Sequence, residues 1–395
     1  MLRLYDTLSR EIRDFEPLED EVKFYACGPT VYSYAHIGHM RTYVNNDCLR
    51  RTLEYLGHQV KHVMNITDVG HLTSDEDFGE DKMAKGAKKE GLTIWDLAKK
   101  YTDHFYYTMD HLNVLRPHHN PKATETIEEQ IDFVRRLEEK EYTYKTSVGL
   151  IYDTSKYLDY TKLARLSLEG QQVGVRVEVD PDRKNPWDFA LWITNQPDHL
   201  MQWDSPWGRG FPGWHLECSV MSRMFLGDTL DIHAGGIEHI PVHHTNEIAQ
   251  SEAVTGKKFV RFWFHNHWLI YKGEKMSKSL GNIITIDTMI ERDIDPLVFR
   301  FMYLNHHYRS TLEYDEKILQ NTIKSYNNFR AAISHLGSQA SEIGVPLPSL
   351  IDEFKEVIGD DLALPRALTV AWKVLREDVG GPEDRLATIV EMDKV

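Results

Sequence analysis

The sequence predicts an α/β protein, with a parallel sheet that is interrupted by an inserted region and followed by a helical bundle. Three observations carry this prediction. Short apolar runs alternate with an amphipathic helical pattern over residues 22–66, and the same texture returns near residue 214. Between these parts, from about residue 142 to residue 202, short β-like runs alternate with turns. From residue 314 to the end, the pattern is helical.

The composition is that of a globular protein and limits the classes of function. The chain has 395 residues, of which 41% are hydrophobic, and this length suggests two or three domains. A formal net charge of −15 argues against indiscriminate coating of nucleic acid, although a local basic track could recognise one folded RNA. No apolar run reaches the length of a membrane span, and the N-terminus has no signal-peptide layout. The three cysteines cannot all pair, so we expect a reducing, cytoplasmic location.

Residues 1–120 are expected to form the first half of a Rossmann-type sheet domain. Apolar runs at residues 2–8, 22–26 and 60–66 predict strands, and periodic apolar positions predict a helix from about residue 40 to residue 57. Strand, helix and strand in this order form the unit of a parallel sheet. Residues 70–90 are polar, and we expect a solvated loop there rather than a metal site. A second helix is predicted over about residues 93–115.

The turn over residues 27–39, between the strand at 22–26 and the helix after it, is the feature around which the chain is organised. We call it the histidine turn. Ligands bind at the carboxyl ends of parallel strands, and the free N–H groups of a helix N-terminus suit a phosphate. Gly28 and Gly38 allow close approach of the backbone, His36 and His39 can present two imidazoles to a phosphate, and Cys27 adds a thiol. Taken alone, the turn could equally serve only packing.

Residues 121–205 are expected to form a connective insertion, and residues 206–270 the second half of the sheet domain. In the insertion, a helix is predicted over about residues 124–141, with strands at 149–153 and 173–179. In the second half, a helix begins near Trp214 and carries Cys218 on the same face. A strand at 230–233 precedes a turn at 234–236, and the helix from about residue 241 carries His243 and Glu247 on one face. A last strand is predicted at 259–264.

Residues 271–313 are expected to hold a lysine-containing loop, and residues 314–395 the helical bundle. Lys275 and Lys278, in a Ser/Gly-containing loop over residues 275–282, could form a mobile clamp for phosphate, with a solvated basic loop as the alternative. Within the bundle, the Pro/Gly-containing segment 344–348 breaks the helical pattern, and another helix is predicted at 364–376.

Four side chains from separate elements have the chemistry of zinc ligands: Cys27, Cys218, His243 and Glu247. Zinc accepts thiolate, imidazole and carboxylate in a tetrahedral set. The alternative is ordinary packing, because a buried cysteine usually packs. Cys48 falls within the first helix and is assigned to packing. The four positions are not a sequence-local zinc finger, so their spacing alone leaves both interpretations open.

Together, these stretches resemble the cysteinyl-tRNA synthetases, a family of class I aminoacyl-tRNA synthetases. The resemblance covers about residues 1–330. The histidine turn and the lysine loop alone indicate a class I synthetase, and the cysteine- and histidine-containing stretches narrow it to this family. The matching stretches are CGPTVY (27–32), HIGH (36–39), NITD (65–68), NPWDF (185–189), PGWHLECS (212–219), DIH (231–233), HH (243–244), NEIAQ (246–250) and KMSKSLGN (275–282).

The resemblance implies a Rossmann-type catalytic domain and the activity of a cysteine--tRNA ligase. Such an enzyme activates cysteine with ATP and Mg²⁺ to cysteinyl-adenylate and transfers the cysteine to tRNA(Cys). The resemblance also implies a catalytic zinc, Zn2+, on Cys27, Cys218, His243 and Glu247, which binds the substrate thiolate. Because zinc prefers thiolate sulfur to a serine hydroxyl, the metal itself can discriminate between the two amino acids. Residues 271–313 would hold the KMSKS loop and contact the tRNA stem.

Further roles follow from the same resemblance. Positioning and charge stabilisation of the triphosphate and departing pyrophosphate are assigned to His36, His39, Lys275 and Lys278. Binding of ATP is assigned to Gly38, Asp231, Gly235, Gly236 and Lys278, with Asp231 as a ribose candidate. The amino-acid pocket is assigned to Thr30, Thr67 and Trp214. We expect a monomer with no membrane contact.

Two departures from the family pattern keep other functions open. A longer acidic loop follows residues 65–68, and members of the family usually continue beyond the helical bundle into a small anticodon-reading domain. This chain ends near the point where that domain would begin, so we expect a truncated version or a protein that does not recognise an anticodon. One alternative is a ligase of the mycothiol-pathway type, which joins cysteine to an amino sugar through the same adenylate chemistry. Another is a non-catalytic, zinc-containing tRNA-binding protein.

Overall fold

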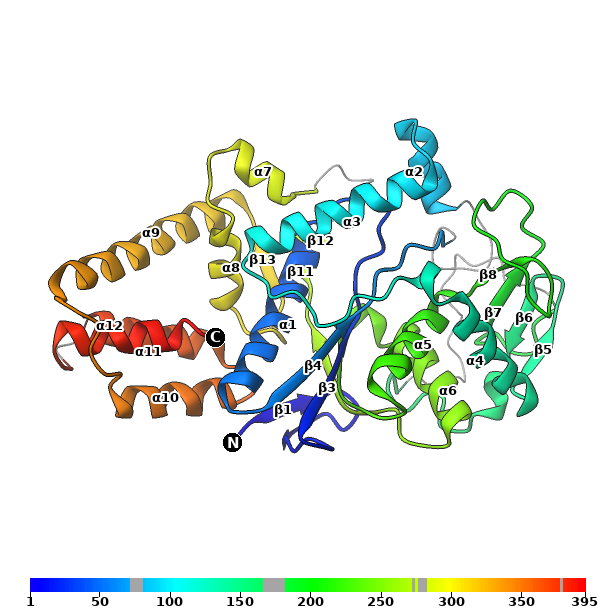
Figure 1. Cartoon of the computed structure of the whole chain (residues 1–395), viewed down its shortest axis with the longest axis horizontal. Helices are drawn as coiled ribbons and strands as arrows, with labels where there is room; N and C mark the ends of the chain where they lie inside the picture. Colours follow the sequence, from blue (N-terminus) through cyan, green and yellow to red (C-terminus); the bar gives the residue numbers. More distant parts are fainter. Residues whose placement is uncertain (72–80, 166–181, 272–273, 276–282, 377–378) are drawn as a thin grey trace.

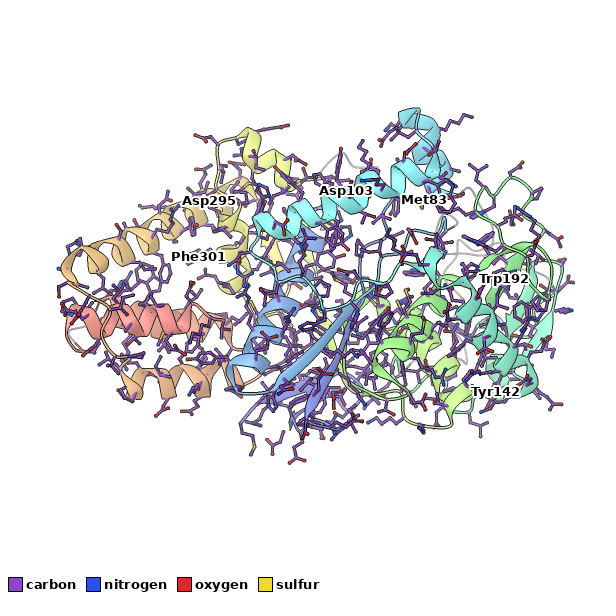
Figure 2. All side chains as sticks on the ribbon, in the orientation of Figure 1. Met83, Asp103, Tyr142, Trp192, Asp295 and Phe301 are labelled. Carbon is purple, nitrogen blue, oxygen red and sulfur yellow. The ribbon has the colours of Figure 1, made fainter. Side chains whose placement is uncertain are left out.

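In the computed structural model, a parallel sheet stands at the centre, with an insertion on one side and a helical bundle on the other (Figure 1). The structure describes the chain except for residues 72–80, 166–181, 272–273, 276–282 and 377–378. Side chains occupy much of the space between the ribbons (Figure 2). No helix among the described residues is both long enough and apolar enough to cross a membrane.

The central sheet has four parallel strands in the order β10-β9-β3-β4. These strands are β3 (Glu21–Ala26), β4 (Gln59–Met64), β9 (Leu230–Gly236) and β10 (Val260–Asn266). Helix α1 (Ile37–Tyr55) connects β3 to β4, as the strand–helix–strand pattern predicted. The carboxyl ends of all four strands therefore meet at one edge, where the histidine turn begins.

Strand β9 is longer than the sequence predicted. The expected turn at residues 234–236 is wrong, because Gly235 pairs with His265 and Gly236 with Asn266 in the parallel ladder. The strand predicted at residues 2–8 is present as β1 (Arg3–Asp6). Strand β1 pairs antiparallel with β2 (Glu11–Asp14) in a separate two-stranded sheet, not in the parallel sheet.

The polar segment at residues 70–90 is not a solvated loop in its described part. Residues 81–90 contain helix α2 (Lys82–Glu90), and the Asp81 carboxylate accepts N–H groups of Met83 and Ala84 as its N-cap. Met83 is fully buried, and His71 is buried as well. Helix α3 (Ile94–His111) follows and packs against α2. The helix was not predicted because charged residues dominate this segment, although its few apolar side chains share one buried face.

The insertion is built on an antiparallel sheet in the order β5-β6-β7-β8. Its strands are β5 (Thr143–Lys145), β6 (Gly149–Tyr152), β7 (Phe189–Thr194) and β8 (Gly210–Pro212). Helix α4 (Ile127–Glu139) contacts α5 (Trp214–Leu226) and α6 (His243–Thr255), so the insertion is packed against the second half of the sheet domain. The strand predicted at 173–179 lies outside the described residues.

The C-terminal part is helical, as predicted. After β11 (Leu269–Tyr271) and β12 (Glu274–Lys275), the chain forms α7 (Ile286–Glu291), α8 (Leu297–Leu304) and β13 (Leu312–Tyr314). The bundle itself comprises α9 (Glu316–Gln339), α10 (Pro348–Gly359), α11 (Leu364–Arg376) and α12 (Pro382–Met392). Phe301 of α8 packs against Phe329 of α9, with ring centroids 5.6 Å apart, which joins the bundle to the rest of the molecule. Cys48 is fully buried inside α1, as expected for a packing residue.

Candidate functional site

Four side chains predicted as metal ligands lie together at the carboxyl edge of the parallel sheet. Cys27 directly follows β3, Cys218 lies on α5, and His243 and Glu247 lie one turn apart on α6. One donor atom from each residue lies within 4.8 Å of the others, and all four residues are buried. We call these four residues the first donor set. Since they come from three separate elements, only the folded chain brings them together.

The backbone around the first donor set is held by Asn65, which follows β4. Its Oδ1 accepts the backbone N–H of Gly28 at 2.8 Å and faces Cys218 Sγ at 3.8 Å. A Cβ at Gly28 would lie 1.6 Å from the carbonyl oxygen of Asn65, so the close contact of these two segments requires glycine. This contact fixes Cys27 relative to Cys218 across the sheet edge.

Electrostatics within the first donor set favour the charged forms of Cys218, His243 and Glu247, but not that of Cys27. A hydrogen bond from Cys27 lowers the pKa of Cys218 to about 7, whereas burial raises the pKa of Cys27 well above its usual value. Burial is the largest single influence on His243 and Glu247 and opposes their ionisation, but the charged and hydrogen-bonding neighbours of each group together outweigh it. The pKa of His243 therefore rises to about 10, and that of Glu247, which His233 also stabilises, falls to about 2. The proton on His243 thus balances the Glu247 carboxylate, and a divalent cation bound by both side chains would take the place of that proton.

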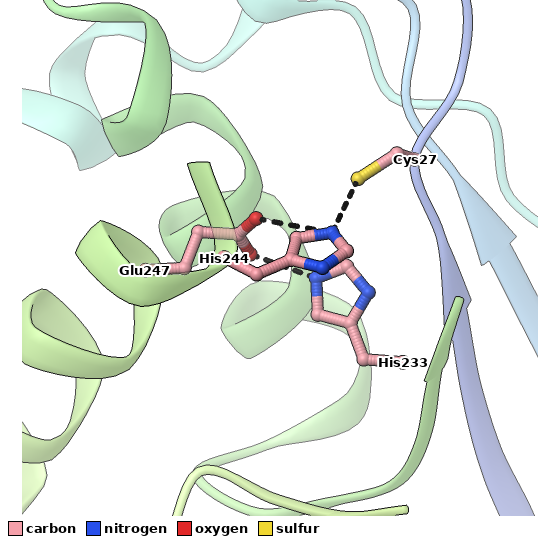
Figure 3. A group of neighbouring side chains, drawn as sticks. All are labelled: Cys27, His233, His244 and Glu247. Atoms are coloured by element: carbon pink, nitrogen blue, oxygen red, sulfur yellow. Dashed lines mark hydrogen bonds and ion pairs between the residues drawn. The ribbon is translucent and has the colours of Figure 1, made fainter. Parts of the chain in front are cut away.

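Sequence reasoning missed two further histidines beside this cluster. His233 and His244 form a second group of potential ligands with Cys27 and Glu247, again with donor atoms within 4.8 Å of one another (Figure 3). The available signals were the adjacent pair at residues 243–244 and a histidine inside the strand at 230–233. Neither signal indicates which imidazole faces the sulfur, because this depends on how α6 packs over the sheet.

A cavity of about 200 Å³ opens beside the first donor set and the histidine turn. Among the predicted site residues, it is lined by Cys27, Thr30, His39, Trp214, Gly235 and Gly236. The Trp214 ring lies against the His243 ring, with centroids 4.3 Å apart, so the cavity wall and the metal-ligand candidates are in contact. The His39 ring stacks on the His36 ring at 3.6 Å, and His36 Nδ1 accepts the N–H of Gly38 as the N-cap of α1.

Thr67 lies behind this cavity rather than on its wall. Its Oγ1 donates a hydrogen bond to Glu217 Oε2 at 2.7 Å, and His71 Nε2 lies 2.6 Å from the other oxygen of the same carboxylate. Residues 30 and 67 form a parallel β-bridge, through which Thr67 supports the segment that carries Thr30. The structure therefore makes Thr67 a support of the cavity wall.

The structure places Asp231 away from the cavity. The predicted contact of its carboxylate with ribose is therefore wrong. Asp231 lies near the start of β9, whereas the cavity is at the end of this strand. Its carboxylate accepts backbone N–H groups of Leu18 and Lys23, at 2.7 and 2.9 Å. The carboxylate is fully buried and connects β9 to Leu18, in the loop before β3, and to Lys23, within β3. Of the lysine loop, the backbone of Lys275 lies in β12 and pairs with Ile270, and Lys278 lies outside the described residues.

Comparison with protein families gives one match that covers most of the chain. Residues 14–324 match the model described as "tRNA synthetases class I (C) catalytic domain". The "Cysteine--tRNA ligase 1" of Burkholderia lata is 45% identical over 403 residues, which cover 100% of this chain and 83% of that protein. The "Cysteine--tRNA ligase" of Treponema denticola is 42% identical over 419 residues, which cover 100% of this chain and 85% of that protein.

Solved structures share the fold at low sequence identity. A Mycobacterium tuberculosis methionyl-tRNA synthetase in complex with methionyl-adenylate has a TM-score of 0.65 at 14% identity, covering 95% of this chain and 89% of that one. A ternary complex named "Agrobacterium radiobacter K84 agnB2 LeuRS-tRNA-LeuAMS" has a TM-score of 0.67 at 12% identity, covering 96% of this chain and 83% of that one. These two similarities concern the arrangement of the elements.

Proposed function

The chain belongs to the class I tRNA synthetases of the cysteine--tRNA ligase family, and from this premise we propose that it activates cysteine with ATP and joins it to tRNA(Cys). The observation that carries the proposal is the meeting of the first donor set with the cavity beside the histidine turn. A group that binds sulfur and a surface suited to a triphosphate thus adjoin one another.

The first donor set would hold a zinc ion. Its donors are two sulfurs, an imidazole and a carboxylate, a combination that suits zinc, and their burial excludes competing water. When bound, zinc supplies a preference for thiolate over hydroxyl, which separates cysteine from serine. Cys27 contributes to both the donor set and the cavity wall, so a substrate sulfur in the cavity lies next to the ligands. Trp214 closes the cavity on the same side.

Activation would take place at the histidine turn. One carboxylate oxygen of cysteine attacks the α-phosphorus of Mg²⁺–ATP, the bond to the β-phosphate bridging oxygen breaks, and pyrophosphate leaves as cysteinyl-adenylate forms. His39 lines the cavity and can donate to a phosphate oxygen as its negative charge rises. His36 orients the first turn of α1 through Gly38, and we assign Lys275 and Lys278 to the pyrophosphate.

Adenosine would approach along the end of β9. A Cβ at Gly235 would lie 2.6 Å from the His244 ring, and one at Gly236 would lie 2.5 Å from the Glu238 carboxylate. Side chains at these two positions would therefore displace their neighbours, and glycine keeps this part of the cavity wall open. In the second step, the terminal ribose hydroxyl of tRNA(Cys) attacks the carbonyl carbon, and AMP leaves.

Two assays test this proposal in sequence. Cysteine-dependent ATP–pyrophosphate exchange is expected with zinc present, and serine should give no exchange at the same concentration. Absence of exchange with cysteine would contradict the proposal. Charging of tRNA(Cys) is then expected from the same preparation. Exchange without charging would instead favour the ligase that joins cysteine to an amino sugar. We also propose that the protein is cytoplasmic and acts as a monomer, and sedimentation with and without tRNA can test the oligomeric state.

A further inference from the structure

The second group of potential ligands is a complete set in its own right. This second donor set consists of Cys27, His233, His244 and Glu247 (Figure 3). It shares Cys27 and Glu247 with the first donor set, and two imidazoles take the places of Cys218 and His243. The two sets therefore differ in chemistry, since the first offers two sulfurs and the second offers one.

The separations between donor atoms in the second donor set suit a four-coordinate ion. Cys27 Sγ lies 3.3 Å from His244 Nε2, and His244 Nε2 lies 3.8 Å from Glu247 Oε1. His233 Nε2 lies 2.8 Å from the other oxygen, Glu247 Oε2. Around a tetrahedral zinc with ordinary bond lengths, neighbouring ligand atoms are about 3.3–3.8 Å apart. The first two separations lie in this range, and the 2.8 Å hydrogen-bond contact between His233 and Glu247 has to lengthen when an ion enters.

An outer hydrogen-bond partner orients His244 for ligation, whereas His233 is held by ring packing. His244 Nδ1 contacts His265 Nε2 at 2.7 Å, and His265 Nδ1 contacts Thr7 Oγ1 at 2.7 Å. Such an outer partner on one ring nitrogen is typical of metal-binding histidines and leaves the other nitrogen directed at the ion. The His233 ring stacks on Trp263 with centroids 4.9 Å apart, and its buried Nδ1 has no hydrogen-bond partner.

We propose that this centre can hold one divalent transition-metal ion in either of two overlapping positions, on the first donor set or on the second. The proposal rests on the zinc site of the proposed function and extends it. Because Cys27 and Glu247 serve both positions, one ion occupies one position at a time. Zinc prefers the first donor set for its additional thiolate. The second donor set retains the ion in the protein when Cys218 is not available as a ligand.

Cobalt(II) titration of the metal-free full-length protein tests the proposal, because absorption from thiolate-to-cobalt charge transfer reports bound sulfur. The Cys218→Ala variant is expected to bind one equivalent of cobalt, with about half the wild-type charge-transfer absorbance, because one thiolate remains of two. Its affinity should fall by at least about 10-fold relative to the wild type. The Cys218→Ser variant, of nearly the native size, should behave in the same way if Cys218→Ala folds poorly.

Two further variants serve as matched controls. His244→Ala alone should keep the wild-type spectrum and stoichiometry, since it leaves the first donor set complete. The double variant Cys218→Ala/His244→Ala lacks a ligand from each set and should bind at least about 100-fold more weakly than the wild type.

Three results would overturn the proposal. Loss of all cobalt binding in a folded Cys218→Ser variant would remove the second position, while the zinc site and cysteine-dependent exchange of the wild type would stand. Binding of two equivalents by the wild type would contradict the sharing of ligands. Absence of cobalt from the wild type would contradict the zinc site itself, a failure that is distinguishable from the other two.

Discussion

The first donor set and the histidine turn adjoin one cavity but differ in their exposure to solvent. Cys218 is 2% exposed and Glu247 is 0% exposed, and both are fixed by the packed helices α5 and α6. At the histidine turn, by contrast, His39 is exposed and His36 half-buried. The amino-acid end of the site is therefore enclosed, and the phosphate end is open.

This difference corresponds to the two tasks of the proposed reaction. Recognition of one sulfur atom benefits from a site without water, where electrostatic interactions are stronger and a hydroxyl cannot find other partners. A triphosphate with its magnesium ion is large and charged, so it needs an accessible surface. We therefore expect that substitutions in the enclosed region abolish metal binding, whereas substitutions in the open region slow the reaction and leave the metal bound.

The largest effect is expected from Cys27→Ala, because Cys27 belongs to both donor sets. Bound metal should be lost, and cysteine-dependent pyrophosphate exchange should fall by at least about 10³-fold. Metal analysis and the exchange assay measure the two effects on one sample. Cys48→Ala is the matched control, since it also removes a buried thiol, but from the interior of α1. One equivalent of bound metal in the Cys27→Ala variant would show that Cys27 is not a metal ligand, and would contradict the role proposed for the enclosed region.

Substitution at the histidine turn should affect the chemical step and leave the metal in place. His39→Ala is expected to reduce the kcat of exchange by about 10²–10³-fold, the effect of losing a donor to a developing charge. The metal content should equal that of the wild type. His335→Ala, at an exposed histidine of α9, should change neither quantity. Loss of metal from His39→Ala would show that the open and enclosed regions are one unit.

Low pH is expected to lower the free energy of unfolding through a histidine in the sheet core, away from both regions. Burial lowers the pKa of His62 on β4 to about 3, and its ring stacks on Phe24 with both nitrogens unpaired. Below the unfolded-state pKa of about 6.5, the unfolded chain binds the additional proton, so the free energy of unfolding falls as pH falls toward 3. At pH 5 this loss amounts to about 2 kcal/mol.

The His62→Phe variant should lack this contribution. Denaturant unfolding at pH 7 and pH 5 should show a stability loss about 2 kcal/mol smaller in the variant than in the wild type. An identical loss in both proteins would assign the acid sensitivity to other groups, including those of the first donor set.

The smallest effect is expected at Trp214, which lines the cavity next to His243. Trp214→Phe should raise the KM for cysteine by roughly 10-fold through lost contact area, while the KM for ATP stays unchanged. Trp95→Phe, on a side chain of α3 that is 54% exposed, is the control. A change confined to ATP would place Trp214 on the nucleotide side of the cavity.

The strand–helix–strand order over residues 22–66 was predicted from the sequence pattern, and the four members of the first donor set were singled out by their chemistry and by the family resemblance. Each of these four residues stands in a distinctive stretch, at the end of a strand or on a helix at a spacing of one turn. Such local patterns are visible without coordinates. The rule that parallel strands end at one edge placed Cys27 there, but the meeting of all four residues was implied by the family resemblance.

Features that depend on packing could not be predicted in the same way. Nothing in the local sequence distinguishes His244, which faces Cys27, from its neighbour His243. The glycines at 235 and 236 suggested a turn, but ladder pairing with β10 extends the strand through both. Asp231 had the right chemistry for ribose, but backbone N–H groups of Leu18 and of Lys23 in the neighbouring strand β3 occupy its carboxylate. In each case, the partner comes from another part of the chain.

The most direct test of the account is the number of sulfur ligands at the zinc, measured by X-ray absorption on the purified protein. Two sulfurs are predicted in the free enzyme, from Cys27 and Cys218, and three after saturation with cysteine. Serine at the same concentration should leave the number at two. A count that does not increase with cysteine would contradict the claim that the buried cluster selects the substrate by its sulfur.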